Sequence, residues 1–349
     1  MIFRKSGFVF ALLASLVVLF SCSSKKTKPA VSFYYWRTEL SLKKNEKAAL
    51  KENQVSAIYL RCFDIVYDEK LKRAVPHAIL RFRDTELVAQ IVPVVFIKNQ
   101  VFLELDSNGI DTLAEHTFLL LEQINQSQSI SAKELQIDCD WTQKTSENYF
   151  HFLRLLKQKL GAKPRSFPAA KLSATIRLHQ IKYAGLQGVP PVDKGVLMFY
   201  NMGKINGSPV SSVYDRNLSR SYLAALNKYP LPLDFALPVF AWGIHLRRGQ
   251  VIELLNKMDS RDFANKNEFE ANGKSRFIAK QSVFKNGFYF KAGDEIKVEE
   301  IEAQDFESMA EDLTEHYKRP IEQLIFYDLD SINISRYEKD IFKKVATDF

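Results

Sequence analysis

The chain has few of the residues that build metal centres, and they are widely spaced. Its 349 residues include 3 cysteines and 6 histidines, with no cluster at metal-ligand spacing. The sequence also lacks a glycine-rich phosphate loop after its first predicted strand, which argues against a nucleotide-binding sheet. We therefore expect no bound metal and no other cofactor.

Positive charge is in mild excess but is not concentrated anywhere. The 49 Lys and Arg against 41 Asp and Glu give a formal net charge of +8, spread through segments of mixed sign. No Lys/Arg block with interleaved aromatic residues is present, so nucleic acid is not an expected partner. The excess indicates solubility or contact with an anionic membrane surface.

The N-terminus resembles the leader of a bacterial lipoprotein. A basic pair at positions 4 and 5 precedes an apolar stretch at 7–20, which has the length of a signal peptide and is short for a membrane span. The Leu-Phe-Ser-Cys sequence that ends at Cys22 is similar to a lipobox. This resemblance implies a signal peptide at 1–21, cleavage before Cys22 and acylation of that cysteine. The alternative is an ordinary signal peptide or anchor helix with an incidental cysteine.

The lipoprotein interpretation also predicts a location. Acylated Cys22 would anchor the protein in the lipid bilayer of the cell envelope, with residues 22–30 as a tether. Ser23, rather than Asp, after the cysteine favours the outer membrane. The segment after Cys22 lacks an acidic export tag, so the periplasmic face is favoured over the cell surface.

Eight apolar runs alternate with amphipathic segments along the rest of the chain. The strand-like runs are 31–37, 57–65, 88–97, 135–142, 171–178, 195–202, 235–242 and 324–329. The helical patterns are 112–126, 146–160, 220–228, 250–258, 305–317 and 337–346. This order predicts an α/β fold, a single (β/α)8 TIM-type barrel over residues 31–349, in preference to a doubly wound open sheet. Cys62 and Cys139 fall inside strands, which favours buried free thiols over a disulfide.

One segment departs from this alternation. Residues 265–301 contain strand-like runs at 275–284 and 287–290, and the Asn286-Gly287 pair between them is a strong hairpin signal. We expect a small β-rich insertion after the seventh strand. It would serve either as a lid over the barrel mouth or as a structural flap.

The fourth predicted strand carries two carboxylates on one face. In the Leu-Gln-Ile-Asp-Cys-Asp-Trp-Thr segment at 135–142, alternation places Asp138 and Asp140 on one side and Trp141 on the other. Paired carboxylates repel each other and are costly to bury, so a purely structural strand has little use for them. We predict that they point into the barrel axis or mouth as catalytic candidates, that one has a raised pKa, and that Trp141 faces the helices.

Further candidates stand at the other strand ends, where the working groups of such barrels lie. We assign substrate-binding roles to Arg37, Arg61, Arg177, His179, Tyr200, Asn201, Trp242 and Asp328, with Trp36, Glu39, Asp64 and Asp330 beside them. Each has a structural alternative: an arginine can pair with an aspartate, a histidine can cap a loop, and a tryptophan can belong to the core. Only their convergence on one place would indicate a site.

Two of these motifs resemble family 18 glycoside hydrolases, the chitinases and their relatives. The 135–142 segment is similar to their fourth-strand signature, which ends Asp-x-Asp-Trp-Glu, and Met-Phe-Tyr-Asn at 198–201 resembles their sixth-strand Met-x-Tyr-Asp. The resemblance implies that Asp140 and Tyr200 hold the N-acetyl group of a substrate. Thr142 stands where the general-acid Glu should be, and Asn201 where the Asp should be. A threonine hydroxyl cannot act as a general acid near neutral pH, so ordinary chitinase chemistry is not expected.

Nearly the whole mature chain resembles an uncharacterised family of bacterial secreted proteins, a domain of unknown function. The shared features are Gln-x-Asp-x-Asp at 136–140, Leu-Ser-x-Thr at 172–175, Pro-Val-Asp at 191–193 and the segment at 197–203 that ends Met-Gly. This resemblance implies a glycosidase-like barrel and no established activity.

Three functions fit these features. The first is a membrane-tethered glycosidase-like enzyme acting on cell-envelope or foreign polysaccharide, with its acid supplied by Asp140, Glu39 or Asp328. The second is a non-catalytic, lectin-like carbohydrate-binding barrel, which the missing Glu favours. The third is a structural envelope lipoprotein, which leaves the paired carboxylates unexplained.

Overall fold

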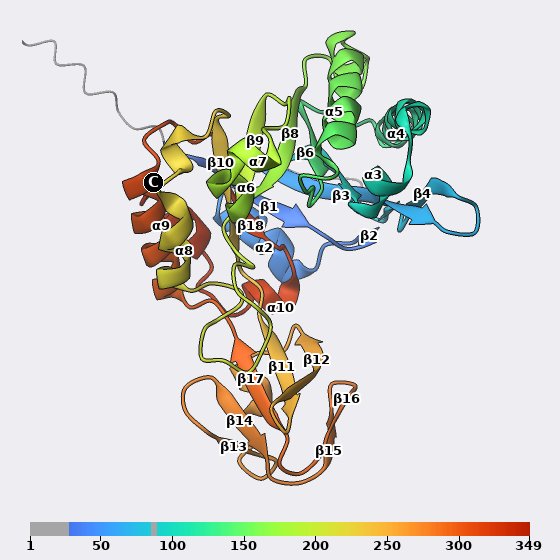
Figure 1. Cartoon of the computed structure of the whole chain (residues 1–349). Coiled ribbons are helices and arrows are strands. Elements are labelled where there is room, and N and C mark those ends of the chain that lie inside the picture. The colour runs from blue at the N-terminus through green and yellow to red at the C-terminus, as the bar shows by residue number, and fades with distance from the viewer. Residues whose placement is uncertain (1–27, 85–88) are drawn as a thin grey trace, which may run out of the picture.

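Eight parallel strands close into a barrel in the computed structural model of the chain, which describes residues 28–84 and 89–349 (Figure 1). The barrel strands are β1 (Ala30–Tyr35), β3 (Ala57–Asp68), β6 (Gln90–Ile97), β7 (Glu134–Asp138), β8 (Lys171–Arg177), β9 (Lys194–Met198), β10 (Leu233–Pro238) and β18 (Gln323–Tyr327). They pair in sequence order, and β1 pairs with both β3 and β18, which closes the sheet. The predicted (β/α)8 TIM-type fold is confirmed.

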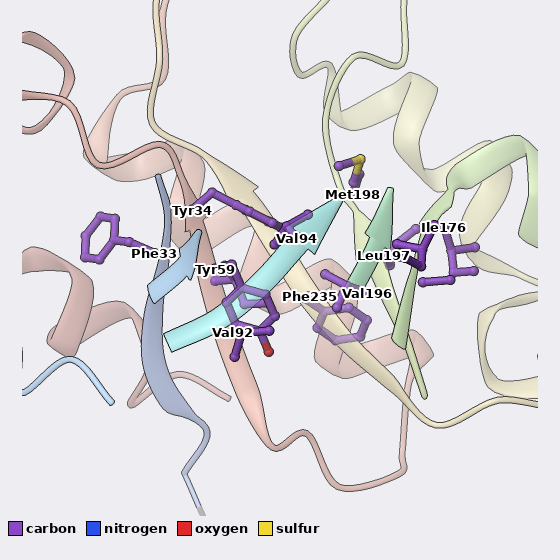
Figure 2. Packing of buried hydrophobic residues seen from close by; sticks show 14 of the residues in the cluster. Phe33, Tyr34, Tyr59, Val92, Val94, Ile176, Val196, Leu197, Met198 and Phe235 are labelled. Carbon is purple, nitrogen blue, oxygen red and sulfur yellow. The ribbon is translucent and has the colours of Figure 1, made fainter. Parts of the chain in front are cut away.

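The barrel strands are buried on both faces because helices cover the outside and side chains fill the inside. Phe33 of β1 packs outward against Phe342 and Phe326, with ring centroids 4.9 and 5.6 Å away. Its neighbour Tyr34 is fully buried, and its hydroxyl donates to the Gln136 side chain of β7. Figure 2 shows this apolar packing.

The described helices follow the strands as a barrel requires. They are α2 (Lys44–Glu52), α3 (Gln100–Glu104), α4 (Ser107–Ser127), α5 (Ser146–Gly161), α6 (Leu178–Lys182), α7 (Ala184–Gln187), α8 (Arg216–Leu223), α9 (Ala303–His316), α10 (Ser331–Ile334) and α11 (Ile341–Val345). Three of them begin at capping aspartates: Asp106 accepts from Gly109 N, Asp215 from Leu218 N, and Asp330 from Ile332 N. None of the helices in the described ranges is long and apolar enough to cross a membrane.

The insertion after the seventh barrel strand is larger than predicted. Five strands form one antiparallel sheet: β11 (Trp242–Arg247), β12 (Gln250–Asn256), β13 (Phe269–Ala271), β14 (Arg276–Ala279) and β17 (Glu295–Glu299). A hairpin of β15 (Val283–Lys285) and β16 (Phe288–Phe290) turns at Asn286-Gly287, as expected. Figure 1 shows this sheet standing away from the barrel.

The helix expected at 250–258 is wrong, because this segment forms β12. Arg248 and Gly249 both have positive φ angles, 52° and 77°, and make a two-residue turn between β11 and β12. The insertion therefore begins at Trp242, well before the expected start at residue 265.

Two smaller features lie outside the predicted pattern. β3 runs beyond the barrel and forms a hairpin with β4 (Arg73–His77), and β2 (Glu39–Leu40) pairs with β5 (Arg81–Phe82). Cys62 and Cys139 are both buried free thiols, as expected. The predicted signal peptide and Cys22 lie outside the described residues.

Candidate functional site

Asp138 is the last residue of β7 and is almost completely buried, with 4% of its surface exposed. The Thr175 hydroxyl, on the adjacent strand β8, donates to its carboxylate at 2.6 Å. Burial raises the pKa of Asp138 to about 6, opposed by the nearby charge of Arg177 and assisted by that of Asp140. One carboxylate of the pair thus has a raised pKa, but burial is a larger cause than the expected mutual repulsion.

Asp140 lies beyond the end of β7 and is half-exposed, because the strand stops at Asp138. Arg177, at the end of β8, donates to it through two nitrogens: Nε to Oδ1 at 2.5 Å and a terminal nitrogen to Oδ2 at 3.1 Å. Such a two-point pair orients both groups and keeps the carboxylate as an acceptor. Arg177 therefore fixes the orientation of the Asp140 carboxylate and uses both of its oxygens as acceptors.

The residues after Asp140 belong to the helix layer. Trp141 is fully buried, stacks on Tyr149 of α5 with ring centroids 5.4 Å apart, and donates its indole N–H to the Gln187 carbonyl at 3.0 Å. Trp141 thus packs against the helices, as predicted. Thr142 is exposed, and its backbone N–H donates to the Thr145 hydroxyl at 2.9 Å just before α5. Thr142, which stands where the chitinase-like motif has its general-acid Glu, therefore lies in the turn that leads into α5.

A row of aromatic rings lines the barrel mouth beyond the two carboxylates. Tyr200 stacks on Tyr327 at 5.5 Å and meets Phe240 edge-on at 5.9 Å. Phe240 in turn contacts Trp242 at 5.1 Å, and Trp36 packs on Tyr327 at 5.6 Å. These five rings form a continuous wall, which we call the aromatic wall.

The Tyr200 hydroxyl connects this wall to the carboxylates. It is buried and has no hydrogen-bond partner among the residues that the structure describes. Burial raises the pKa of Tyr200 well above its ordinary value, and the nearby charges of Asp138 and Asp140 raise it further while Arg177 lowers it. The structure thus brings Asp138, Asp140, Arg177 and Tyr200 together, with Trp242 joined to them through Phe240.

Arg61, on β3, is paired with a residue of its own strand. Its guanidinium contacts the Asp64 carboxylate through two nitrogens and donates to the Trp36 carbonyl at 3.2 Å. A β-bulge at Cys62 lets both charged residues point the same way from β3. The guanidinium also lies 5.7 Å from the Trp36 ring centroid, so Arg61 supports the aromatic wall.

A second pair of carboxylates, Asp328 and Asp330, follows β18. Asp328 is buried, accepts from Asn333 Nδ2 at 2.7 Å, and has a pKa raised to about 6 by burial and by the charge of Asp330. Asp330 is paired with Lys257 at 2.7 Å. Arg37 forms an ion pair with buried Glu46 of α2 at 2.7 Å. This pairing is the structural alternative to a substrate-binding role for Arg37.

Three other candidates make no hydrogen bond to Asp138 or Asp140 in the described part of the chain, although His179 lies near enough to Asp140 and Arg177 for their charges to act on its pKa. His179 is exposed on α6, and partial desolvation lowers its pKa. Asn201 is exposed with a φ of 54°, and its backbone N–H closes a loop onto Val213 O at 2.9 Å. Glu39 lies 3.4 Å from Arg83 and 3.6 Å from Arg81, beside the small β2–β5 sheet.

Sequence reasoning missed several contributors. Tyr327, Phe240 and Thr175 were not singled out, although all three lie on predicted strands. Trp242 begins β11 instead of ending the seventh barrel strand, because β10 stops at Pro238. No group of three or more His, Cys, Asp or Glu within residues 28–84 and 89–349 could hold a metal ion.

The barrel is similar to solved structures of a spore cortex-lytic enzyme and of chitinases. The spore cortex-lytic enzyme SleL of Bacillus cereus matches with a TM-score of 0.54 and 14% identity, over 92% of this chain and 75% of that chain. A chitinase from Chromobacterium violaceum matches with a TM-score of 0.53 and 13% identity, over 92% and 98%. A mutant class V chitinase from Cycas revoluta, in complex with (GlcNAc)3, matches with a TM-score of 0.54 and 12% identity, over 91% and 99%.

At these identities the likeness shows a glycoside-hydrolase-like fold alone. No family model and no curated protein matches the sequence. The resemblance to an uncharacterised bacterial family therefore stays a prediction.

Proposed function

We propose that this protein is a membrane-tethered, glycoside-hydrolase-like barrel that binds cell-envelope or foreign polysaccharide at its mouth. Binding, rather than cleavage, is the function that the geometry supports best. The observation that carries this choice is the two-point pairing of Asp140 with Arg177, together with an exposed Thr142 at the start of a helix. The Asp140 carboxylate accepts from Arg177 at both oxygens, and Thr142, at the position of the resembled family's acid, cannot act as a general acid.

The aromatic wall supports a sugar ligand in particular. Sugar rings have apolar faces that stack on aromatic side chains, and their hydroxyl and amide groups need a few oriented polar partners. Trp242 is partly exposed beside Phe240, and the buried Tyr200 hydroxyl lacks a protein partner among the described residues. The neighbours' bound sugars, (GlcNAc)3 in the Cycas enzyme among them, suggest suitable probes.

Hydrolysis is the second candidate, and Asp138 favours it. A buried carboxyl with a pKa of about 6 is partly protonated near neutral pH, which suits a general acid. Asp328 has the same raised pKa but belongs to the group that follows β18.

Binding and turnover of (GlcNAc)3 and of purified peptidoglycan by the whole protein test both candidates. We expect Trp242→Ala to weaken binding, while Phe284→Ala, which removes an exposed aromatic side chain from the β15–β16 hairpin, leaves it unchanged. Asp140→Asn should also weaken binding, whereas Asp111→Asn, on α4, should not.

The outcomes separate the candidates clearly. Binding by the wild type without turnover supports the lectin-like function. Turnover that is lost in Asp138→Asn while binding persists supports the enzyme. If the wild type binds neither probe, and Trp242→Ala behaves like Phe284→Ala, the carbohydrate proposal is wrong.

A further inference from the structure

Glu299, the last residue of β17, is a buried carboxylate that joins three distant segments of the chain. Its side chain is 1% exposed. Oε1 accepts from Ser212 N at 2.9 Å and from Lys297 Nζ at 2.6 Å. Oε2 accepts from the Trp242 indole N–H at 2.9 Å and from the Ser212 hydroxyl. Four donors thus surround one carboxylate, from β11, from β17 and from the loop between β9 and α8.

The loop in question carries one wall of the barrel mouth. It follows β9, with Tyr200 as its second residue, and its base is closed by Asn201 N donating to Val213 O at 2.9 Å and Gly203 N donating to Ser212 O at 3.1 Å. Ser212 therefore belongs both to the base of this loop and to the shell around Glu299.

The β11–β17 sheet of the insertion, which we call the insertion sheet, contacts the same loop at further points. Lys297 Nζ donates to Val210 O at 2.7 Å while it pairs with Glu299. Arg276 of β14 also donates to the Gly207 carbonyl. The position of the loop thus depends on the insertion sheet as well as on the barrel.

The indole nitrogen is the only polar atom of the Trp242 side chain, and its N–H donates a hydrogen bond to Glu299. The Trp242 ring lies 5.1 Å from the Phe240 ring, centroid to centroid, which joins it to the aromatic wall, and the residue remains partly exposed. Stacking alone leaves an aromatic ring free to change its tilt, whereas a hydrogen bond from the indole N–H to a charged acceptor defines its orientation. The Glu299 carboxylate is buried and fully surrounded, so the acceptor itself is fixed.

Resting on the proposed glycan-binding function, we propose that Glu299 is a positioning residue for the sugar-binding wall. It sets the orientation of Trp242 and holds the loop between β9 and α8, which carries Tyr200, against the insertion sheet. The insertion is then an integral part of the binding site.

The charge of Glu299 is needed for this role. Burial by itself would raise the pKa of Glu299, but the hydrogen bonds from Lys297, Ser212 and Trp242 lower it below its ordinary value. The carboxylate therefore stays ionised and offers acceptors to all four donors. In Glu299→Gln one oxygen becomes an NH2 group, which cannot accept, so at least one donor loses its partner and Lys297 loses its counter-ion.

The first measurement needs no ligand. Protein labelled with 15N in its tryptophans gives three indole N–H signals, for Trp36, Trp141 and Trp242. Glu299→Gln should shift the Trp242 signal and speed its exchange with solvent by about ten-fold or more, the loss of roughly one charged hydrogen bond. The Trp141 signal should stay in place, which shows that the barrel is intact. An unchanged Trp242 signal overturns the proposal.

The second measurement is a double-mutant cycle on (GlcNAc)3 binding. Trp242→Phe keeps a ring but removes the N–H, and Glu299→Gln should weaken binding by about five-fold or more. If Glu299 acts through Trp242, the double variant should bind no more weakly than the worse single variant. Additive losses overturn the positioning role. Ser212→Ala, which removes one donor only, should give a smaller loss of affinity in the same direction.

The matched control is Glu253→Gln. Glu253 lies in β12 of the same sheet, and its carboxylate is 3.2 Å from His245 within the insertion. It should leave both the Trp242 signal and the affinity unchanged. If the wild type binds no glycan, the proposed function fails while the indole measurement still decides the positioning role.

Discussion

Replacing Asp138 with Asn should make the protein more stable than the wild type above pH 6. Burial raises the pKa of this carboxyl from 3.8 to about 6 in the folded protein. Since one pKa unit corresponds to about 1.4 kcal/mol, ionised Asp138 costs the folded state about 3 kcal/mol at high pH. The neutral Asn side chain carries no such cost and still offers an acceptor to the Thr175 hydroxyl.

The sign of this effect sets the pH range of the assay. Below the unfolded pKa of 3.8, Asp138 is protonated in both states and its contribution to stability is fully present. The contribution is lost as the pH rises through the folded pKa of about 6, and it stays constant above that. The difference in unfolding free energy between Asp138→Asn and the wild type should therefore grow between pH 4 and pH 7.

Urea unfolding at a series of pH values measures this difference directly, because the other carboxylates are common to both proteins. Asp140→Asn is the matched control. Its side chain is half-exposed and paired with Arg177, so its loss should cost about 1 kcal/mol or less and give no stabilisation at pH 8. A pH-independent difference for Asp138→Asn, or a less stable variant at pH 8, would refute the reasoning.

Other changes test the barrel, the insertion and the tether. Lys194→Met should lower stability by about 3–5 kcal/mol, because it leaves the buried carboxylates of Glu134 and Asp234 without their shared cation; a loss of less than about 1 kcal/mol in denaturant unfolding would contradict this. Gly287→Ala, at a φ of 87°, should cost the insertion about 1 kcal/mol of stability, measured in the same way, and no loss would argue against the positive φ. Cys22→Ser should abolish metabolic labelling with a fatty acid, and equal labelling of both proteins would remove the proposed lipid anchor.

The barrel could be predicted because its signal is local and repeated. Each barrel strand is buried on both faces, so the chain shows eight runs rich in Val, Ile, Phe and Tyr with helical patterns between them. The Asn286-Gly287 hairpin was equally visible, because two consecutive positive φ angles, 50° and 87°, demand such residues.

The failure at 250–258 has a specific cause. Val251, Leu254 and Leu255 recur at the spacing of one helix face, which made a helix the natural interpretation. The same residues form a ladder with β11, and the deciding signal was the Arg248-Gly249 turn before them. The apolar pattern of a short segment can fit a helix as well as a strand. The turn residues before the segment therefore decide between the two.

The candidate site divides along the same line between local and distant contacts. Arg61 and Asp64 pair across three residues, a spacing that points side chains to opposite faces of a regular strand, and the local bulge at Cys62 brings them together. Arg177 and Asp140 pair across 37 residues, and nothing in the sequence says which arginine an aspartate will meet. Alternation placed Asp140 on the inner face of a strand, but the strand ends two residues earlier.

The role of Asp140 follows from these distant contacts rather than from its motif. In the resembled motif this aspartate precedes a glutamate acid, whereas here Thr142 begins the approach to α5 and Arg177 takes both carboxylate oxygens. A carboxylate held in that way accepts hydrogen bonds and can orient a polar group. Beside it at the end of β7 is Asp138, whose pKa is raised to about 6 by burial and, to a smaller extent, by the charge of Asp140. The choice between binding and cleavage therefore rests on whether a sugar held by the aromatic wall can reach Asp138, and the comparison of Asp138→Asn with Trp242→Ala measures that.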